Sequence, residues 1–205
     1  MHARSTTIHG DPACIDDAVA YLQNKMLPEL IQHEGCLGLS ALTDRETGRC
    51  IVTTAWTDQA LMRATAEGIR PWRHSVEHML GSQHSDVQEW EIAVLHRDRP
   101  AGDGAAAQVT WARTAPEDVD GLLGAYRTDL LPRLQQLPGF CSVSVLVDRR
   151  AGRTVAVTSF QSEEARSRDR ARQSHAQFAQ GKGSTIIDVH DMELALAHLR
   201  VPELV

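Results

Sequence analysis

The sequence predicts an α+β protein in which two tandem ferredoxin-like units (β-α-β-β-α-β) form an intramolecular pseudo-dimer. Three observations predict it: an internal duplication, the same order of strand-like and helix-like segments in both copies, and a sheet face that one layer of helices leaves bare. The chain has 205 residues, enough for two domains of about a hundred residues each. We expect a first domain over 1–97, a linker over 98–107 and a second domain over 108–205.

The duplication emerges when the chain is shifted by 104 residues, which places 15–60 on 119–164 without a gap. Thirteen of these 46 positions are identical, against about three expected by chance from ordinary composition. Near the end of each copy the shift becomes 102, so that Glu91 meets Glu193 and His96 meets His198. Two residues are therefore missing from the second copy between these blocks.

Each copy predicts the same elements in the same order. Helices with apolar residues at 3–4 spacing open at Asp16 and Asp120. Gly35 and Gly139 follow these helices, where a left-handed cap requires glycine. The remaining elements are an opening strand (5–8; 109–112), a hairpin (36–43 with 50–56 in the first copy), a second helix (58–80; 162–180) and a closing strand (87–95; 189–197). The recurring pairs Asp44-Arg45 and Asp148-Arg149 are explained by hairpin-turn chemistry.

Composition narrows the choice of partners and compartment. The formal net charge of −6 argues against general binding to nucleic acid or to acidic membranes. No apolar run reaches the ~18 residues of a membrane span, and the first residues lack a signal-peptide core. The four cysteines show no ligand spacing, which favours reduced thiols and a cytoplasmic location.

Several short segments carry a resemblance to a known family. Glu34-Gly35-Cys36-Leu37 and Pro138-Gly139-Phe140-Cys141 follow the first helices, and Trp56-Thr57-Asp58 and Trp90-Glu91-Ile92 lie at strand ends. They resemble the antibiotic biosynthesis monooxygenase (ABM) family of dimeric α/β barrels, over nearly the whole chain. The resemblance implies the fold more than the function, because the family includes cofactor-independent monooxygenases of aromatic or quinol-like molecules, haem-degrading oxygenases and proteins without established activity.

The haem-degrading branch of that family implies a pocket with an asparagine on the first strand, and a tryptophan and an axial histidine on the second helical region. The histidine position falls on His74, whereas the tryptophan and asparagine positions fall on Thr65 and near Thr7. The resemblance therefore implies haem binding through His74 as an alternative to a protein without cofactor. It does not imply haem degradation by the usual mechanism of that branch.

The segment around Pro71 is the main candidate for a ligand site. Proline is expected to break the second helix and restart it, and such a break opens a cleft suited to a flat aromatic ligand. On an unbroken helix His74 would instead lie opposite the apolar stripe and face water, with Trp72 filling the core. The candidate ligand-binding residues are Trp72, Thr7, Thr65 and Ile69.

Histidines supply the candidate catalytic groups, because imidazole titrates near neutral pH. His74 and His96 are the candidate bases, although a histidine at a strand end, such as His96, is also an ordinary structural hydrogen-bonding residue. His74, Glu77 and His78 have the spacing of an inverted zinc motif, but the predicted fold supplies no third ligand. We therefore predict no metal site.

Three functions remain open from the sequence. The first is a cofactor-independent monooxygenase that orients an aromatic or quinol-type anion in a first-copy pocket, and the second is a haem or aromatic-ligand binding protein using His74. The third is a non-enzymatic scaffold or stress-related protein.

The expected partners are a small aromatic molecule and the internal pseudo-dimer, with further homodimerisation left open. The arginine-rich segment 163–172 has two interpretations, a solvated helix face or an anion-binding rim.

Overall fold

The structure is a computed structural model that describes residues 1–102, 104–166 and 170–205. It contains two compact units. Unit 1 comprises Met1–Trp90 and Glu193–Val201, and unit 2 comprises Glu91–Met192 and Pro202–Val205. Within the described part of the chain, no helix combines the length and hydropathy needed to cross a membrane.

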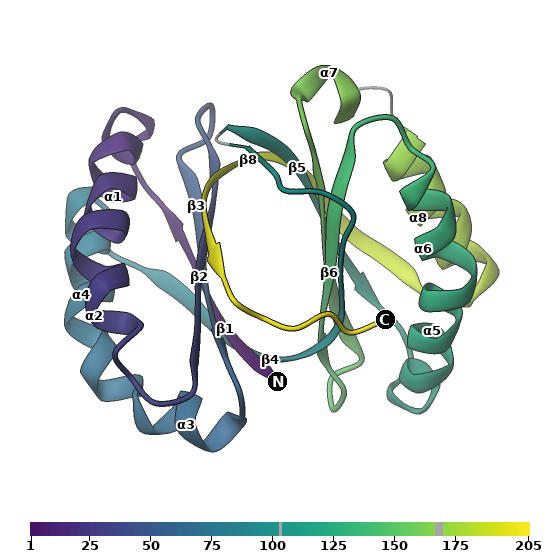
Figure 1. Cartoon of the computed structure of the whole chain (residues 1–205), viewed down its shortest axis with the longest axis horizontal. Helices are drawn as coiled ribbons and strands as arrows, with labels where there is room; N and C mark the ends of the chain where they lie inside the picture. The colour runs from purple at the N-terminus through teal and green to yellow at the C-terminus, as the bar shows by residue number, and fades with distance from the viewer. Residues whose placement is uncertain (103, 167–169) are drawn as a thin grey trace. The chain divides into compact units, whose positions relative to one another are not determined.

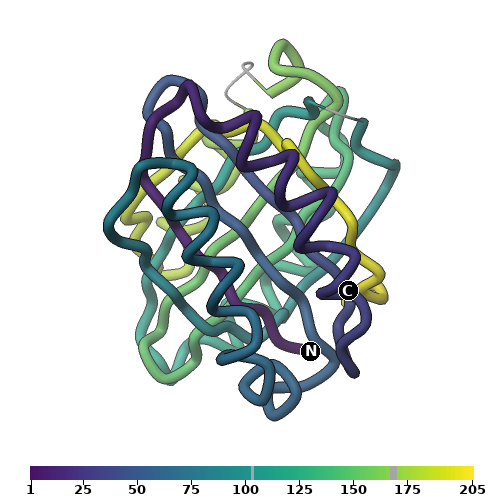
Figure 2. Tube along the Cα trace, turned by 90° about the vertical axis from the view of Figure 1, so that its left-hand side faces the viewer, coloured from purple at the N-terminus to yellow at the C-terminus, as the bar shows by residue number. Residues whose placement is uncertain are grey.

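Unit 1 is a sheet with helices on one face. Its elements are β1 (His2–His9), η1 (Pro12–Cys14), α1 (Ile15–Tyr21), η2 (Leu22–Met26), α2 (Leu27–Leu30), β2 (Cys36–Asp44), β3 (Arg49–Trp56), α3 (Gln59–Ala64), α4 (Ala66–Met79), the first part of β4 (Ser85–Arg97) and the last part of β8 (Thr185–Leu199). The strand order is β4-β1-β3-β2-β8, and β3 is antiparallel to both β1 and β2. The helices α1, α2 and α4 lie along this sheet in Figure 1, and α1 runs beside α4 in Figure 2.

Unit 2 repeats this plan. Its elements are the last part of β4, β5 (Ala105–Arg113), η3 (Pro116–Asp118), α5 (Val119–Ala125), η4 (Tyr126–Leu130), α6 (Leu131–Gln135), β6 (Phe140–Asp148), β7 (Arg153–Phe160), α7 (Glu163–Arg166), α8 (Arg170–Gly181) and the first part of β8. Its strand order is β8-β5-β7-β6-β4, with β7 antiparallel to both β5 and β6. The β-α-β-β-α-β order predicted for each copy is confirmed.

The details at element ends differ from prediction in places. Gly35 and Gly139 both have φ of 74°, which confirms the left-handed caps. The linker predicted over 98–107 is shorter, because β5 already begins at Ala105. Asp103 in that linker, and 167–169 in the second helix predicted for the second copy, lie outside the described residues.

The closing strand of each copy is shared between the units. Glu91–Arg97 of β4 pairs with β6 of unit 2, and residues of β8 from Glu193 onward pair with β2 of unit 1. An arginine of the β2–β3 hairpin binds the strand that enters unit 1. Arg45 Nε lies 2.6 Å from Glu193 Oε2, and its Nη1 lies 2.8 Å from Asp16 Oδ1.

Unit 2 contains the equivalent ion-pair cluster. Arg149 Nε lies 2.6 Å from Glu91 Oε2, and Arg149 also binds Asp120. The explanation of the recurring Asp-Arg pairs by turn chemistry alone is therefore wrong for the arginines, because they bind the strand that comes from the other copy. It holds for Asp44, whose carboxylate accepts hydrogen bonds from the turn amide of Glu46.

The second helix of unit 1 is not broken at Pro71. The interruption lies at Thr65, between α3 and α4, and α4 continues through Pro71 to Met79. Pro71 is exposed, so water can reach the carbonyl that its missing N–H leaves without a helical partner. The prediction of a kink that opens a cleft at Pro71 is wrong.

The first helix of each unit contains a π turn immediately before a helix-borne proline. The turns span Leu22–Met26 and Tyr126–Leu130, and Pro28 and Pro132 follow two residues later. Proline has no N–H and clashes with the carbonyl four residues before it, and a widened turn relieves this clash. In unit 1 both ends of the π turn, Leu22 and Met26, are buried against the sheet.

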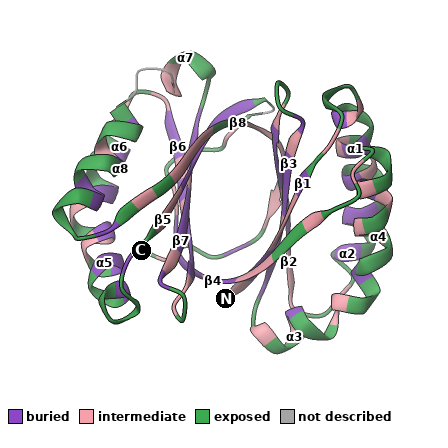
Figure 3. Ribbon diagram, turned by 180° about the vertical axis from the view of Figure 1, so that it is seen from behind, coloured by how far each residue is buried: buried purple, intermediate pink, exposed green. Residues whose placement is uncertain are grey.

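The core of each unit lies between its sheet and its helices, and Figure 3 shows buried residues on the strands and exposed residues on the outer helix faces. In unit 1 the fully buried Trp56 belongs to this core together with Leu22 and Leu30. Its indole Nε1 donates to Thr54 Oγ1 at 3.0 Å, which satisfies the one polar atom that this large side chain buries.

Gly38→Ala should destabilise the protein by about 2 kcal/mol or more. Gly38 has φ of 121° at the β2 bulge, and an added Cβ would lie 1.9 Å from the carbonyl oxygen of His198 on β8. Gly68→Ala is the matched control: this glycine lies in α4 with open space around its Cβ position, so alanine should stabilise by roughly 0.5 kcal/mol. Urea denaturation of both variants measures the difference, and equal midpoints would contradict the close approach at Gly38.

Candidate functional site

A cavity of about 250 Å³ lies between the sheet and the helices of unit 1. Its sheet wall consists of Arg4, Thr6, Ile8, Val52, Thr54, Val87 and Glu89. Its helix wall consists of Leu22, Met26, Ala66, Ile69, Arg73 and Val76. The lining is mostly aliphatic, with two arginines and one glutamate as its charged members, a composition typical of a small-molecule site.

Two periodicities in the sequence place these side chains on the cavity. Arg4, Thr6 and Ile8 alternate along β1 and so point to one face of the sheet. Ala66, Ile69, Arg73 and Val76 follow the 3–4 spacing of one face of α4.

Arg4 is the most deeply buried charge of the site. Its side chain is 7% exposed, and its Nη2 lies 3.0 Å from Glu89 Oε1. The other oxygen of Glu89 accepts from Arg63 Nε at 2.9 Å, so one carboxylate serves two guanidinium groups. Partial burial by itself would raise the pKa of Glu89, but the hydrogen bonds from Arg63 and Arg4 outweigh it and lower that pKa. Glu89 is therefore a carboxylate and a weak base at neutral pH.

One donor of Arg4 remains available. Its Nη1 is buried and has no hydrogen-bond partner among the described residues. A charged donor that is buried without a partner is costly, and binding an acceptor would recover that cost. Arg4 is also a residue of the cavity lining, so the wall of the cavity contains a guanidinium group with an unused donor.

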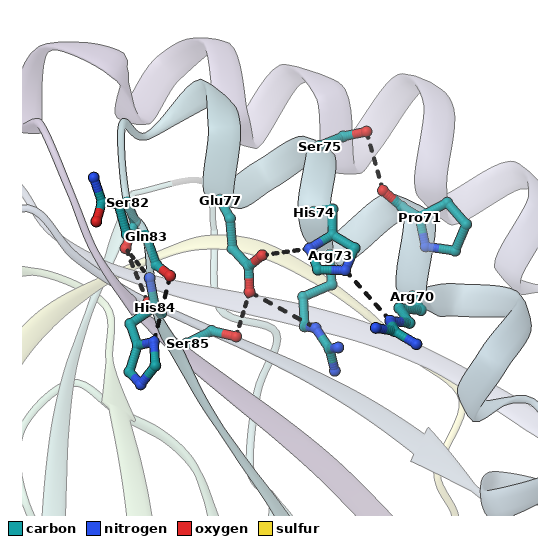
Figure 4. A network of polar contacts seen from close by, with 10 residues as sticks. All are labelled: Arg70, Pro71, Arg73, His74, Ser75, Glu77, Ser82, Gln83, His84 and Ser85. Carbon is teal, nitrogen blue, oxygen red and sulfur yellow. Dashed lines mark hydrogen bonds and ion pairs between the residues drawn. The ribbon is translucent and has the colours of Figure 1, made fainter.

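Arg73 is the second cation of the cavity, and it belongs to a polar network on α4 (Figure 4). Glu77 receives a hydrogen bond from His74 Nδ1 at 2.8 Å and another from the hydroxyl of Ser85. Arg73 Nε lies 3.7 Å from Glu77 Oε1, which is an ion pair but not a hydrogen bond. Burial tends to raise the pKa of Glu77, but hydrogen bonds from Ser85 and His74 lower it overall.

His74 lies outside the cavity. Its side chain is 56% exposed, and both ring nitrogens have partners, since Nε2 accepts from Arg70 Nε at 3.4 Å. Because α4 is unbroken at Pro71, His74 lies off the face that carries Ile69 and Val76, as expected for an unbroken helix. This placement gives no support to His74 as a base or as an axial ligand directed into the cavity.

The predicted ligand-binding residues are mostly one position away from the lining. Ile69 lines the cavity, but Thr7, Thr65 and Trp72 do not. Their neighbours Thr6, Ala66 and Arg73 take these places. On a strand, a shift of one residue moves a side chain to the opposite face, and on a helix it rotates the side chain by about 100°. Trp72 packs against the core of unit 1, and its ring makes an edge-to-face contact with the His33 ring, with centroids 6.1 Å apart.

His96 belongs to unit 2 and does not line the unit 1 cavity. Its side chain is 15% exposed and stacks on Phe140 with ring centroids 6.4 Å apart. Its Nε2 lies 2.9 Å from Gln135 Nε2. These contacts match the structural alternative for a histidine at a strand end, and nothing in them supports a base in the cavity.

Unit 2 has only a remnant of this cavity, about 30 Å³. Tyr126 stands where the first copy has Leu22, and its hydroxyl donates to His175 Nε2 at 3.1 Å. The His175 Nδ1 in turn donates to the Ala171 carbonyl at 2.9 Å, which fixes the tautomer. Burial raises the pKa of Tyr126 and lowers the pKa of His175, so both groups are neutral. This aromatic pair fills the space that is open in unit 1.

The charges differ between the copies as well. The shift of 104 places Gln108 on Arg4, and Gln108 Nε2 donates to Asp191, the counterpart of Glu89. The shift of 102, applied to the second helix, places His175 on Arg73. Unit 2 therefore lacks both cavity arginines, and this difference was not predicted from the sequence.

The donor set does not fit haem or a metal ion. The cavity is smaller than the ~300–1,000 Å³ of drug-sized ligand sites, and no histidine lines it. Among the described residues no group of three or more His, Cys, Asp or Glu side chains could hold a metal ion. Cys14, Cys36, Cys50 and Cys141 are free thiols.

Comparison with known proteins gives close relatives without assigned activity. No family model matches the chain. It is 42% identical to uncharacterized protein Rv2558 of Mycobacterium tuberculosis (strain ATCC 25618 / H37Rv), over 100% of this chain and 88% of the relative. It is also 42% identical to uncharacterized protein Rv2557 of the same strain, over 100% of this chain and 92% of that protein. The chain belongs to the family of these two mycobacterial proteins.

Solved structures share the fold at low sequence identity. A candidate monooxygenase from Lactobacillus acidophilus NCFM has a TM-score of 0.70 at 9% identity, covering 97% of this chain and 96% of its own. An anthrone oxidase-like protein has a TM-score of 0.64 at 14% identity (94% and 89% coverage). The heme-degrading enzyme LmHde of Listeria monocytogenes has a TM-score of 0.54 at 9% identity (94% and 99% coverage). The expected ABM-like fold is therefore confirmed, and at such identities the likeness extends to the fold alone.

Acid should destabilise the protein through His175. Its folded pKa is depressed by burial, so the unfolded state takes up a proton first as the pH falls below about 6.5. Stability is unaffected well above that pH and decreases below it, by at most about 1.4 kcal/mol per pH unit, until the pH reaches the folded pKa. Urea denaturation between pH 7.5 and 5.5 should show a smaller loss in His175→Gln than in the wild type. Parallel profiles would contradict a buried neutral His175.

Proposed function

We propose that the unit 1 cavity binds the anion of a small phenol or quinol, and that the protein oxygenates it with O₂ and without a cofactor. The observation that carries the proposal is the buried guanidinium of Arg4, which borders the cavity and has an unpartnered Nη1. The likeness to a candidate monooxygenase and to an anthrone oxidase-like protein supports the reaction class by analogy of fold.

Arg4 is suited to stabilise a phenolate. An opposite charge within hydrogen-bond distance lowers the pKa of a bound acid, whereas the apolar walls around it raise that pKa. Glu89 does not cancel the charge of Arg4, because it also neutralises Arg63. The cavity contains no strong base, so deprotonation depends on the acidity that Arg4 confers on the substrate itself.

The reaction needs only O₂ as oxidant. A phenolate or quinolate is electron-rich and can reduce O₂. In the overall conversion of a ring C–H para to the hydroxyl into a quinone carbonyl, one oxygen atom enters the ring. The second oxygen leaves as water with the ring hydrogen and the hydroxyl hydrogen, and O₂ takes up the four electrons that the substrate loses. The chain's own residues contribute binding, orientation and exclusion of water, through Arg4 and the aliphatic walls.

The open cavity favours a ligand-binding protein over a purely structural scaffold. Unit 2 shows how this fold closes the same region, since Tyr126 and His175 reduce it to about 30 Å³. Unit 1 keeps about 250 Å³ with a buried cation at its wall. A chain that served only as a scaffold would gain stability by filling this space.

We further propose that the two units form one intramolecular α/β barrel. Two features support this arrangement: β4 and β8 each supply residues to both units, and the likeness to solved structures extends over 94–97% of the chain. A cytoplasmic location agrees with the sequence analysis and stays part of the proposal.

Arg4→Gln, which introduces the residue of unit 2, should abolish stabilisation of a bound phenolate. We expect wild-type protein to lower the pKa of 4-nitrophenol on binding by about one unit or more, because Arg4 faces the anion. The absorbance of 4-nitrophenolate in a pH titration measures this shift. Arg45→Gln is the matched control, because it removes the same charge outside the cavity.

In this experiment the variant should return the pKa of the bound probe to its free value or above, and the control should behave as wild type. Thermal denaturation checks that both variants fold. A bound probe whose pKa is unchanged or raised in wild-type protein would overturn the assignment of Arg4. Oxygen uptake with a panel of quinols then tests the reaction, and rates equal to buffer would overturn the oxygenase proposal.

His74→Ala should leave the response to hemin unchanged. Because His74 is exposed and already paired with Glu77, we expect no one-site Soret shift that depends on it. A visible-absorbance titration of the two proteins measures this. A saturable shift in wild type that disappears in the variant would support haem binding instead.

A further inference from the structure

We propose that the ligand of the unit 1 cavity carries a carboxylate in addition to its phenolic oxygen, and that Arg73 binds this second anionic group. The inference rests on the proposed function and narrows its substrate class to hydroxyaryl carboxylic acids. It assigns to Arg73 a role in specificity.

The cavity lining presents two guanidinium groups that a ligand can contact. Arg4 and Arg73 both line it, against a single lining carboxylate, Glu89. That carboxylate is shared with Arg63, which lies outside the lining. Glu77 offsets the charge of Arg73 from outside the lining, so Arg4, Arg63 and Arg73 face two carboxylates and keep one net positive charge for an anionic ligand.

Each arginine has a buried donor without a hydrogen-bond partner among the described residues, Nη1 of Arg4 and Nε of Arg73. The carboxylate of Glu77 accepts hydrogen bonds from His74 Nδ1 and from the Ser85 hydroxyl, and its Oε1 lies 3.7 Å from Arg73 Nε. Arg73 is thus held in place by an ion pair, and its hydrogen-bonding capacity is not used up. Guanidinium groups match the planar geometry of carboxylates.

The two arginines lie on different walls. Arg4 comes from β1 in the sheet, and Arg73 comes from α4 in the helix layer, as Figure 4 shows for Arg73. A ligand that contacts both needs its two groups at separated positions of the ring. The side chain of Arg73 is 30% exposed, whereas that of Arg4 is 7% exposed. We place the carboxylate at Arg73, where it keeps part of its hydration, and the phenolic oxygen at Arg4.

The second copy provides an internal comparison. Its counterparts of Arg4 and Arg73 are Gln108 and His175, and its cavity is nearly filled. Both guanidinium groups are therefore absent where the binding space is absent. This joint difference is expected if the two arginines serve one ligand.

Calorimetric titration of two matched probes tests the inference. 4-Hydroxybenzoate carries both groups, and 4-hydroxybenzamide replaces the carboxylate by a neutral amide of similar shape. We expect wild-type protein to bind 4-hydroxybenzoate about tenfold or more tightly than the amide. Arg73→Met should remove this preference and leave the affinity for the amide within about twofold. Arg73→Lys keeps the charge but not the planar donors, so it should retain part of the preference for 4-hydroxybenzoate.

The variants separate the two proposals. Arg70→Met, on the exposed side of α4 and outside the cavity lining, is the control and should bind both probes as wild type does. The role of Arg73 is overturned if Arg73→Met weakens the binding of both probes by the same factor. It is also overturned if wild-type protein shows no preference for 4-hydroxybenzoate. Either result leaves the proposed function intact if Arg4→Gln still weakens the binding of both probes. If Arg4→Gln changes neither affinity, the proposed function fails, whatever the result for Arg73.

Discussion

The buried ion pair between Arg4 and Glu89 is the interaction on which the unit 1 site depends. It joins the first strand to the closing strand on the cavity wall, with the Arg4 side chain 7% exposed. A guanidinium at this depth is costly unless it is paired, and the pair has to be maintained by the surrounding structure. Glu89 also accepts a hydrogen bond from Arg63, and Nη1 of Arg4, a residue of the cavity lining, has no hydrogen-bond partner among the described residues. The same pair thus links the first strand to the closing strand and gives the cavity its polarity.

The two copies share one structural framework and differ at the cavity. Both contain a π turn before a proline, a left-handed glycine after the first helix, and a hairpin arginine bound to the strand that arrives from the other copy. They differ at the cavity, where unit 2 has Tyr126 and His175 in hydrogen-bonded contact and Gln108 in place of the buried arginine. Unit 2 gains buried aromatic contacts and loses the binding space. The framework is therefore common to both copies, while the chemistry is specific to unit 1.

The fold was largely predictable from the sequence because repetition and periodicity specify it. The strand alternation, the helical spacing and the caps at Gly35 and Gly139 are local signals, and the structure confirms them. The site was predicted only in part. Ile69 was found, but Arg4 was missed, because a buried arginine looks like a surface arginine until its alternation with Thr6 and Ile8 is noticed. The exchange of closing strands between units depends on contacts distant in sequence, which local patterns do not contain.

The most direct test of a single anion site in unit 1 is a ¹H–¹⁵N NMR titration of the full chain with 4-nitrophenolate. We expect one binding site, with the largest shifts at the cavity residues Thr6, Ile8, Ile69 and Val76. Their counterparts in unit 2, Thr110, Ala112, Ala171 and Phe178, should move little. Comparable shifts in both units, or shifts confined to exposed surface residues, would contradict a ligand site at Arg4.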